Sequence, residues 1–192
     1  MSAEAAVPPL VAAATARARQ AGFPMSSDPT VGRLLAVLAA HLPEGARVLE
    51  LGTGTGVGTA WIVSGLLPRT DVTVTSVEKH PGTAAAAAAG DWPSFVGLRC
   101  GDALEVLAEG GVFDLIFADA PGGKWEGLDR SVAALRPRGL LIVDDMTPEP
   151  HWTDSYRAAQ DKVRQALLSA TGLTSAELAV GSGVILSARR GQ

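Results

Sequence analysis

The sequence predicts an α/β fold, a doubly wound and mostly parallel sheet that ends in an antiparallel β-hairpin. From about residue 46 onward, short apolar runs rich in β-formers alternate with longer helix-compatible stretches. Most of these runs are continuously apolar, which is typical of parallel strands covered by helices on both faces. Near the C-terminus, two short runs joined by Gly181-Ser182-Gly183 predict the hairpin.

The residues before the first strand predict two helices, over about 8–21 and 29–42. Asp28 suits the N-cap of the second helix, because its carboxylate can accept from a first-turn amide, and Pro29 suits the first helical position. We therefore expect one domain over residues 1–192, with a helical segment at 1–45 and a core at 46–192.

The core is expected to contain five parallel strands, at residues 46–51, 72–78, 94–100, 113–119 and 139–144. Helices over about 57–66, 81–90, 102–109 and 124–135 fill the intervals between them. Pro68, Pro93 and Pro137 fall in the predicted connections, where chain breakers belong. A further helix over about 152–170 leads to the hairpin strands at 176–180 and 184–188.

Composition excludes several classes of partner. The net charge of −4 argues against nucleic acid and against a membrane surface as partners, because both bind basic faces. No apolar run approaches the ~20 residues that span a bilayer. The N-terminus has an acid before its apolar stretch and bases after it, the reverse of a secretory signal, so we expect a cytoplasmic protein. The single cysteine, Cys100, excludes an internal disulfide.

Three glycines at alternate positions, Gly52, Gly54 and Gly56, connect the first predicted strand to the helix that follows. Glycines there allow a tight turn and a close approach of a ligand to the helix N-terminus. No lysine follows them, which excludes a Walker A loop, and their spacing fits the dinucleotide fingerprint badly. The segment Glu50-Leu51-Gly52-Thr53-Gly54-Thr55-Gly56 resembles motif I of the class I S-adenosylmethionine (SAM)-dependent methyltransferases.

Acidic residues stand at or just past the C-terminal end of every predicted parallel strand: Glu50, Glu78, Asp102, Asp119 and the pair Asp144-Asp145. In open α/β sheets, ligands bind in the crevice outside these strand ends, so the six carboxylates are expected to converge on one rim. Such a rim suits the sulfonium, ammonium and ribose diol of SAM, and also a divalent cation. The alternative is that some of the acids cap the following helices, and Asp102 fits that alternative equally well.

Further motifs narrow the resemblance. Met25-Ser26-Ser27 precedes the glycine turn, Phe113-Asp114-Leu115-Ile116-Phe117-Ala118-Asp119 forms the fourth strand, and Leu135-Arg136-Pro137-Arg138-Gly139-Leu140-Leu141-Ile142-Val143-Asp144-Asp145 covers the fifth. From about residue 24 to the end, the chain resembles the catechol and caffeoyl-CoA O-methyltransferase family. The resemblance implies a Rossmann-like class I methyltransferase fold, a small-molecule acceptor and a homodimer.

The resemblance also implies how SAM would be bound. The glycine turn and Glu50 would hold the methionine portion, Glu78 the ribose hydroxyls, and Asp102 with Ala103 the adenine. The full set of candidate cofactor-binding residues is Met25, Glu50, Gly52, Thr53, Gly54, Gly56, Glu78, Lys79, Gly101, Asp102, Ala103 and Asp119.

In this family, three oxygen ligands hold a divalent metal ion, which lowers the pKa of the attacking hydroxyl. Asp119, Asp144 and Asp145 fall on those positions, so Mg²⁺ or another divalent cation is a candidate cofactor. The chain departs from the family pattern twice. The final pair is Asp-Asp rather than Asp-Asn, and the lysine of the Asp-x-x-Lys segment comes two residues late, as Lys124.

Three residues are candidates for catalysis: Asp119, Lys124 and His151. By the family resemblance, Lys124 would position the acceptor or remove its proton. The alternative is a solvated lysine beside a glycine turn. His151-Trp152 lies in a proline-rich loop that is expected to overhang the acceptor pocket, with Trp152 as an aromatic wall and His151 as a base. The alternative for this loop is simple anchoring by a buried Trp152.

We therefore predict a SAM-dependent O-methyltransferase that acts on a phenol-like or catechol-like hydroxyl of a small molecule. Three alternatives stay open. An RNA 2′-O-methyltransferase would share Asp-Ala-Pro after the fourth strand but needs a basic groove. A non-catalytic SAM-binding protein would bind the cofactor without transferring its methyl group. An NAD-dependent oxidoreductase would need a different glycine spacing.

Overall fold

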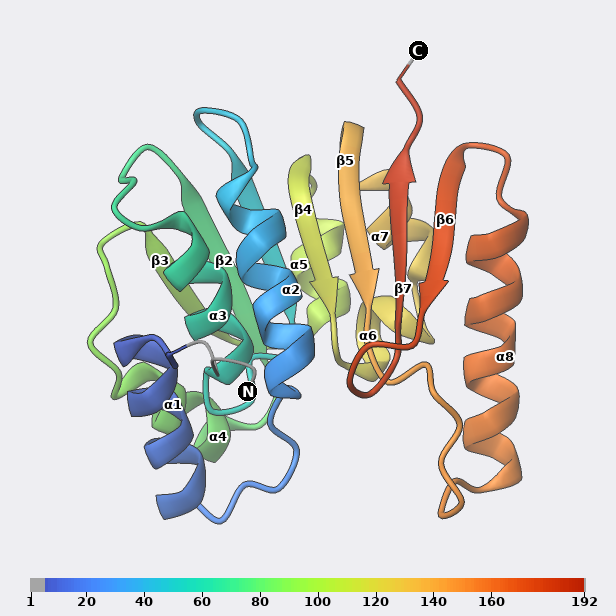
Figure 1. Cartoon of the computed structure of the whole chain (residues 1–192). Coiled ribbons are helices and arrows are strands. Elements are labelled where there is room, and N and C mark those ends of the chain that lie inside the picture. Colours follow the sequence, from blue (N-terminus) through green and yellow to red (C-terminus); the bar gives the residue numbers. More distant parts are fainter. Residues whose placement is uncertain (1–5, 192) are drawn as a thin grey trace, which may run out of the picture.

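The computed structural model describes residues 6–191, which form one seven-stranded sheet with helices on both faces (Figure 1). The outermost residues of the predicted 1–192 domain, 1–5 and 192, lie outside this description. The strands are β1 (Arg47–Leu51), β2 (Thr73–Glu78), β3 (Val96–Cys100), β4 (Phe113–Ala118), β5 (Leu135–Val143), β6 (Leu173–Leu178) and β7 (Val184–Arg189). Their order in the sheet is β3-β2-β1-β4-β5-β7-β6.

The first five strands are parallel, and β7 runs antiparallel to both β5 and β6. The predicted doubly wound sheet with a C-terminal antiparallel hairpin is therefore confirmed. The helices are α1 (Pro9–Gln20), α2 (Pro29–Ala40), α3 (Val57–Leu66), α4 (Pro81–Ala88), α5 (Ala103–Ala108), α6 (Pro121–Lys124), α7 (Leu128–Ala133) and α8 (Asp154–Ser169). Among residues 6–191, every helix is too short or too polar to traverse a bilayer.

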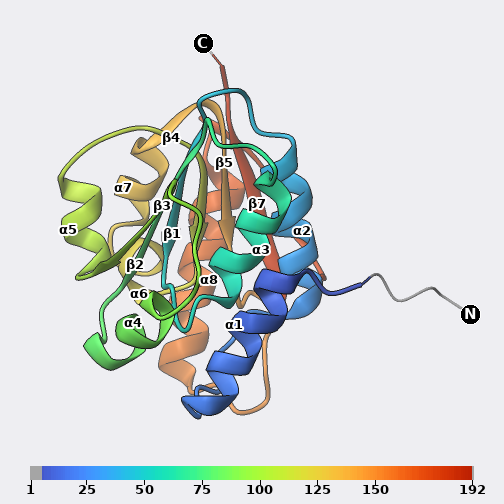
Figure 2. The same cartoon turned by 90° about the vertical axis from the view of Figure 1, so that its left-hand side faces the viewer.

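The helices form two layers around the sheet. Figure 2 shows α5 and α7 on one side of the strands and α2 and α3 on the other. Side chains of one strand alternate between the two layers, so that Leu49 and Leu51 pack toward α5 while Val48 packs toward α2 and α3. Both faces of the parallel strands are buried, as their continuously apolar runs predict.

The N-cap prediction for α2 is confirmed, because the Asp28 carboxylate accepts a hydrogen bond from the Thr30 amide at 2.7 Å. The single helix predicted over 124–135 is wrong. Two short helices, α6 and α7, replace it. Gly123 (φ 88°) kinks the chain inside α6, and Gly127 (φ 74°) is the left-handed N-cap residue of α7.

The predicted start of the fifth strand is also wrong, because β5 begins at Leu135 and Pro137 lies inside it. Phe113 pairs with Leu135 and Leu115 pairs with Leu140, so the intervening β5 residues bulge out of the ladder. A proline is tolerated at such a bulge, where its missing N–H removes no ladder hydrogen bond.

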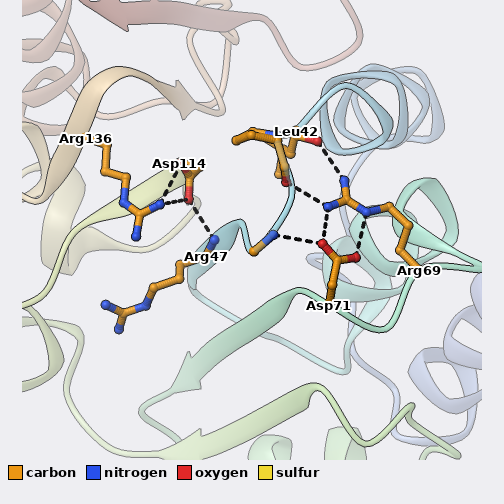
Figure 3. A network of polar contacts seen from close by, with 8 residues as sticks. Leu42, Arg47, Arg69, Asp71, Asp114 and Arg136 are labelled. Carbon is orange, nitrogen blue, oxygen red and sulfur yellow. Dashed lines mark hydrogen bonds and ion pairs between the residues drawn. The ribbon is translucent and has the colours of Figure 1, made fainter.

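At the amino ends of the strands, carboxylates tie the chain together (Figure 3). Asp114, at the start of β4, accepts from the Arg47 amide at 2.8 Å and from the Arg136 guanidinium at 3.2 and 3.3 Å. Asp71 binds Arg69 through two hydrogen bonds, and Arg69 also donates to the Leu42 carbonyl at 2.7 Å. This network fixes the edge of the sheet opposite the strands' carboxyl ends.

Replacing Asp114 with alanine is expected to lower the free energy of unfolding by about 1–2 kcal/mol, because the Arg47 amide loses its partner in a partly buried position. Urea unfolding measures this change. Ligand binding at the carboxyl ends of the strands should not change, so this variant separates global destabilisation from damage to a site. An unchanged urea midpoint would show that the Asp114 contacts contribute nothing to stability.

Candidate functional site

A cavity of about 1680 Å³ opens at the carboxyl ends of the strands. The glycine turn, the ends of β2 to β5, α1 and the loop before α8 all contribute to its walls. Ten of the twelve candidate cofactor-binding residues line it: Met25, Gly52, Thr53, Gly54, Glu78, Lys79, Gly101, Asp102, Ala103 and Asp119. The other two, Glu50 and Gly56, do not.

The glycine turn adopts the backbone that its sequence predicts. Gly52, Gly54 and Gly56 all have positive φ, at 103°, 54° and 92°. A Cβ atom on Gly52 would lie 2.7 Å from the Asp119 carbonyl oxygen, so this glycine is required by both conformation and space. The turn therefore packs directly against the segment that carries the Asp119 carboxylate.

Replacing Gly52 with alanine is expected to lower the free energy of unfolding by about 2 kcal/mol, through left-handed strain and the collision with Asp119. Thermal unfolding measures this loss. Gly82→Ala is the matched control, since outside the backbone of α4 and the two neighbouring residues no atom lies within 4 Å of the position that its Cβ would occupy. A Gly52→Ala protein as stable as the control would contradict the close approach.

Glu78 connects the turn to the end of β2. Its Oε2 accepts from the Gly54 amide at 3.0 Å, and its Oε1 accepts from the His80 amide at 2.9 Å. Each carboxylate oxygen has a second lone-pair direction, and the residue lines the cavity. A carboxylate held by two backbone amides is a rigid acceptor for a pair of ligand hydroxyls.

The expectation that all six carboxylates share one rim is wrong for Glu50. Its side chain is fully buried behind the turn, because within β1 it alternates toward α3 instead of leaving the strand end. Its Oε2 accepts from Ser76 at 2.5 Å and from Thr59. Its Oε1 has no hydrogen-bond partner among the described residues, and it lies where a side chain on Gly58 would be.

Burial raises the pKa of Glu50 to about 7, although the hydrogen bonds from Ser76 and Thr59 oppose that rise. Thr55 also buries a hydroxyl oxygen that has no hydrogen-bond partner within residues 6–191. Unpartnered buried polar atoms are costly, so two of them beside one glycine turn are typical of a place where a polar ligand binds.

Asp102 caps α5, which confirms the prediction that this acid is the cap of the following helix. Its Oδ1 accepts from the Leu104 amide at 2.8 Å, and its Oδ2 accepts from Lys79 at 2.8 Å. Both contacts lower the pKa of Asp102, and the hydrogen bond from Lys79 has the larger effect. The cap does not withdraw the residue from the cavity, which Asp102 and Ala103 both line.

Asp119, Asp144 and Asp145 each offer one carboxylate oxygen, and these oxygens lie within 4.8 Å of one another. We call this group the acid triad. Burial and the neighbouring carboxylates raise the pKa of Asp119 well above its ordinary value, and burial also raises that of Asp144. Three carboxylate oxygens are the donors that hard divalent cations prefer, so the residues present fit such an ion.

Lys124 is 2% exposed and does not line the cavity, so the expectation of a solvated lysine is wrong. Its Nζ lies 3.2 Å from Asp145 Oδ2. Gly122 and Gly123 have non-helical backbone angles inside α6, and this kink turns Lys124 toward the acid triad.

His151, by contrast, is exposed and lines the cavity beside Trp152, as expected.

Sequence analysis missed Tyr156 and Gln160, although Trp152, Tyr156 and Gln160 are spaced four apart around the start of α8 and so share one face. Tyr156 packs on Trp152 at 4.7 Å and on Trp125 at 4.8 Å between ring centroids. Burial and the Asp145 charge raise its pKa to about 12. Buried Gln160 accepts from the Trp125 indole at 3.0 Å and donates to the Asp145 carbonyl at 2.6 Å.

Comparisons with known proteins agree with this geometry. A family model described as a methyltransferase domain matches residues 49–146. A protein of Mycobacterium sp. (strain JLS) is provisionally described as an O-methyltransferase. It is 32% identical to this chain over an alignment of 193 positions, gaps included, which covers 94% of this chain and 86% of that protein. A protein of Mycobacterium tuberculosis (strain ATCC 25618 / H37Rv) with a similar description is 32% identical over 174 residues, 84% of this chain and 76% of that protein.

Solved structures are similar over nearly the whole chain. Cofactor-bound Rv0187 from MTB has a TM-score of 0.82 and 27% identity, and the match covers 100% of this chain and 94% of that chain. An O-methyltransferase from Bacillus cereus in complex with SAH has a TM-score of 0.84 at 22% identity, covering 98% and 94%. At that lower identity the likeness shows the fold alone.

Proposed function

This chain belongs to the class I SAM-dependent O-methyltransferases, in the family similar to caffeoyl-CoA O-methyltransferases, and from that premise we propose that its acceptor is a phenol-like or catechol-like small molecule. This family membership excludes the alternative of an NAD-dependent oxidoreductase, which the glycine spacing already disfavoured. The observation that carries the proposal is the cavity of about 1680 Å³ at the carboxyl ends of the strands. It joins the glycine turn and Glu78, at one end, to the acid triad and the aromatic pair Trp152 and Tyr156 at the other.

The cofactor supplies an electrophilic methyl group when it is bound. Glu50 Oε1, buried without a partner among the described residues, fits the methionyl ammonium, and the nearby Thr55 hydroxyl gives the turn a second free polar atom. Glu78 is suited to accept from the ribose hydroxyls, since its two oxygens are already oriented by backbone amides. Asp102 and Ala103 would border the adenine.

Methyl transfer from a sulfonium needs alignment more than covalent help from the protein. Placing the acceptor oxygen about 3–3.5 Å from the methyl carbon, in line with the breaking bond, supplies much of the rate. We propose that Trp152 and Tyr156 stack on the aromatic ring of the acceptor, and that its hydroxyl donates to Asp119. The Asp119 carboxylate would then receive the proton of that hydroxyl.

A divalent cation held by Asp119, Asp144 and Asp145 would supply one further effect, a lower pKa of the acceptor hydroxyl. His151, exposed at the cavity mouth, is the second candidate for receiving the proton. Lys124 Nζ lies 3.2 Å from Asp145 Oδ2, so its proposed role moves from proton removal to holding Asp145. The family resemblance also supports a homodimer, which sedimentation velocity tests.

Incubation with isotopically labelled SAM and a panel of catechols and phenols tests the proposal, with Mg²⁺ and with EDTA as separate arms. Labelled methyl ether on a catechol or phenol is the expected product. Purified RNA in a parallel arm tests the 2′-O-methyltransferase alternative. SAH binding without methylation of any acceptor would instead indicate a non-catalytic SAM-binding protein, and would overturn the proposal.

A further inference from the structure

The two departures of this chain from its family's pattern meet in one ion pair. Asp145 stands where the pattern has asparagine, and Lys124 comes two residues later than the pattern's lysine. In the folded chain, Lys124 Nζ lies 3.2 Å from Asp145 Oδ2. The added negative charge and the displaced positive charge therefore face each other.

Both partners are held by rigid local structure. The Gly123 carbonyl accepts from buried Ser131 at 2.8 Å, which fixes the kinked turn that points Lys124 inward. Asp145 has a φ of 58°, which is uncommon for a residue other than glycine. Its carbonyl accepts from Gln160 at 2.6 Å, and its amide donates to Asp144 Oδ1 at 2.7 Å.

The charges around this pair call for a cation. Carboxylate oxygens of Asp119, Asp144 and Asp145 lie within 4.8 Å of one another, and like charges at such distances repel. Within residues 6–191, the ion pair found at this triad is the one from Lys124, whose side chain is 3% exposed, whereas that of Asp145 is 43% exposed. A buried charge is stable when it is paired, so the carboxylates compensate the buried ammonium, and the ammonium reduces their mutual repulsion.

We propose that Lys124 is the resident cation of the acid triad and competes with a divalent metal ion for Asp145. A metal ion that coordinates Asp145 must either displace the ammonium or lie close to it, and like-charge repulsion weakens metal binding in both cases. This inference rests on the proposed O-methyltransferase site, but it concerns metal affinity, which can be measured without any acceptor.

The test is calorimetric titration of Mn²⁺ into the full chain, for the wild type and for two variants of one residue. Lys124→Met removes the charge and is expected to bind Mn²⁺ roughly tenfold more tightly or better, since one buried positive charge no longer opposes the ion. Lys124→Arg keeps the charge and is expected to bind no more tightly than the wild type. Lys162→Met, which removes an exposed lysine on α8, is the matched control and should match the wild type.

An unchanged or weaker Mn²⁺ affinity in Lys124→Met would overturn the proposal, as would equal tightening in Lys124→Arg. If Lys124→Met does not fold, Lys124→Gln replaces it, because its amide can still donate to Asp145 without a charge. SAH titrations on the same variants keep the two questions apart. Loss of SAH binding in every protein, the wild type included, would count against the O-methyltransferase site, whereas the Mn²⁺ series alone decides the role of Lys124.

Discussion

Replacing Glu50 with glutamine is expected to weaken SAH binding by roughly tenfold or more at pH 8, because a charge-assisted hydrogen bond to the ligand ammonium is lost. Glu50 Oε1 is the buried acceptor without a partner beside the glycine turn. Glutamine keeps the size of the side chain and the hydrogen bonds from Ser76 and Thr59 to the other oxygen. It removes the negative charge that the ammonium requires.

The same substitution should stabilise the unliganded protein above neutral pH. Burial raises the pKa of Glu50 from 4.5 to about 7. Between these values the folded protein binds a proton that the unfolded chain does not, so stability falls as pH rises. The carboxylate therefore costs about 3 kcal/mol at pH 8, and little of that cost is present near pH 4.5.

Calorimetric SAH titrations and urea unfolding at pH 5.5 and pH 8 check both effects. The wild type should bind SAH more tightly as pH rises through 7, because binding requires the ionised carboxylate, and Glu50→Gln should lose this dependence. Glu105→Gln, an exposed position on α5, is the control for removing a carboxylate charge. A Glu50→Gln protein that binds SAH as the wild type does would remove Glu50 from the cofactor site.

Replacing Asp119 with asparagine is expected to lower kcat by about 100-fold or more, since the amide can neither take the acceptor's proton nor bind a divalent cation well. The substitution is nearly isosteric. It also removes one of three mutually repelling carboxylates, so folding should be unaffected or improved. The SAH affinity should change far less than kcat.

Initial rates at saturating SAM and acceptor measure this effect, with calorimetric SAH titration of the same sample. Asp91→Asn, at an exposed position outside the cavity, is the matched control. An Asp119→Asn enzyme with a kcat within a few-fold of the wild type would move proton removal to His151. It would also remove the acid triad from the proposed reaction.

Features that depend on local chain chemistry could be predicted from the sequence. The alternate glycines predict a tight turn, and Gly52, Gly54 and Gly56 form one in which all three have positive φ. Asp28 followed by Pro29 required a helix start, and α2 begins there. Acids at strand ends required a shared edge, and five of the six carboxylates line one cavity there.

Features that depend on tertiary placement could not be predicted in this way. Glu50 belongs to the same motif as the glycines, but strand alternation turns its side chain behind them. The sequence leaves open whether Lys124 is a catalytic or a solvated residue, and only the kink in α6 brings it to Asp145. Pro137 is predicted in a connection between elements, whereas a bulge opposite β4 accommodates it inside β5.

A crystal structure of the protein with SAH is the sharpest test of the proposed cofactor site. The ribose hydroxyls are expected to contact Glu78, the methionyl ammonium to reach Glu50 Oε1, and the sulfur to face Asp119. SAH bound outside this cavity, or bound within it while Glu50 Oε1 stays without a partner, would show that the proposed site is wrong.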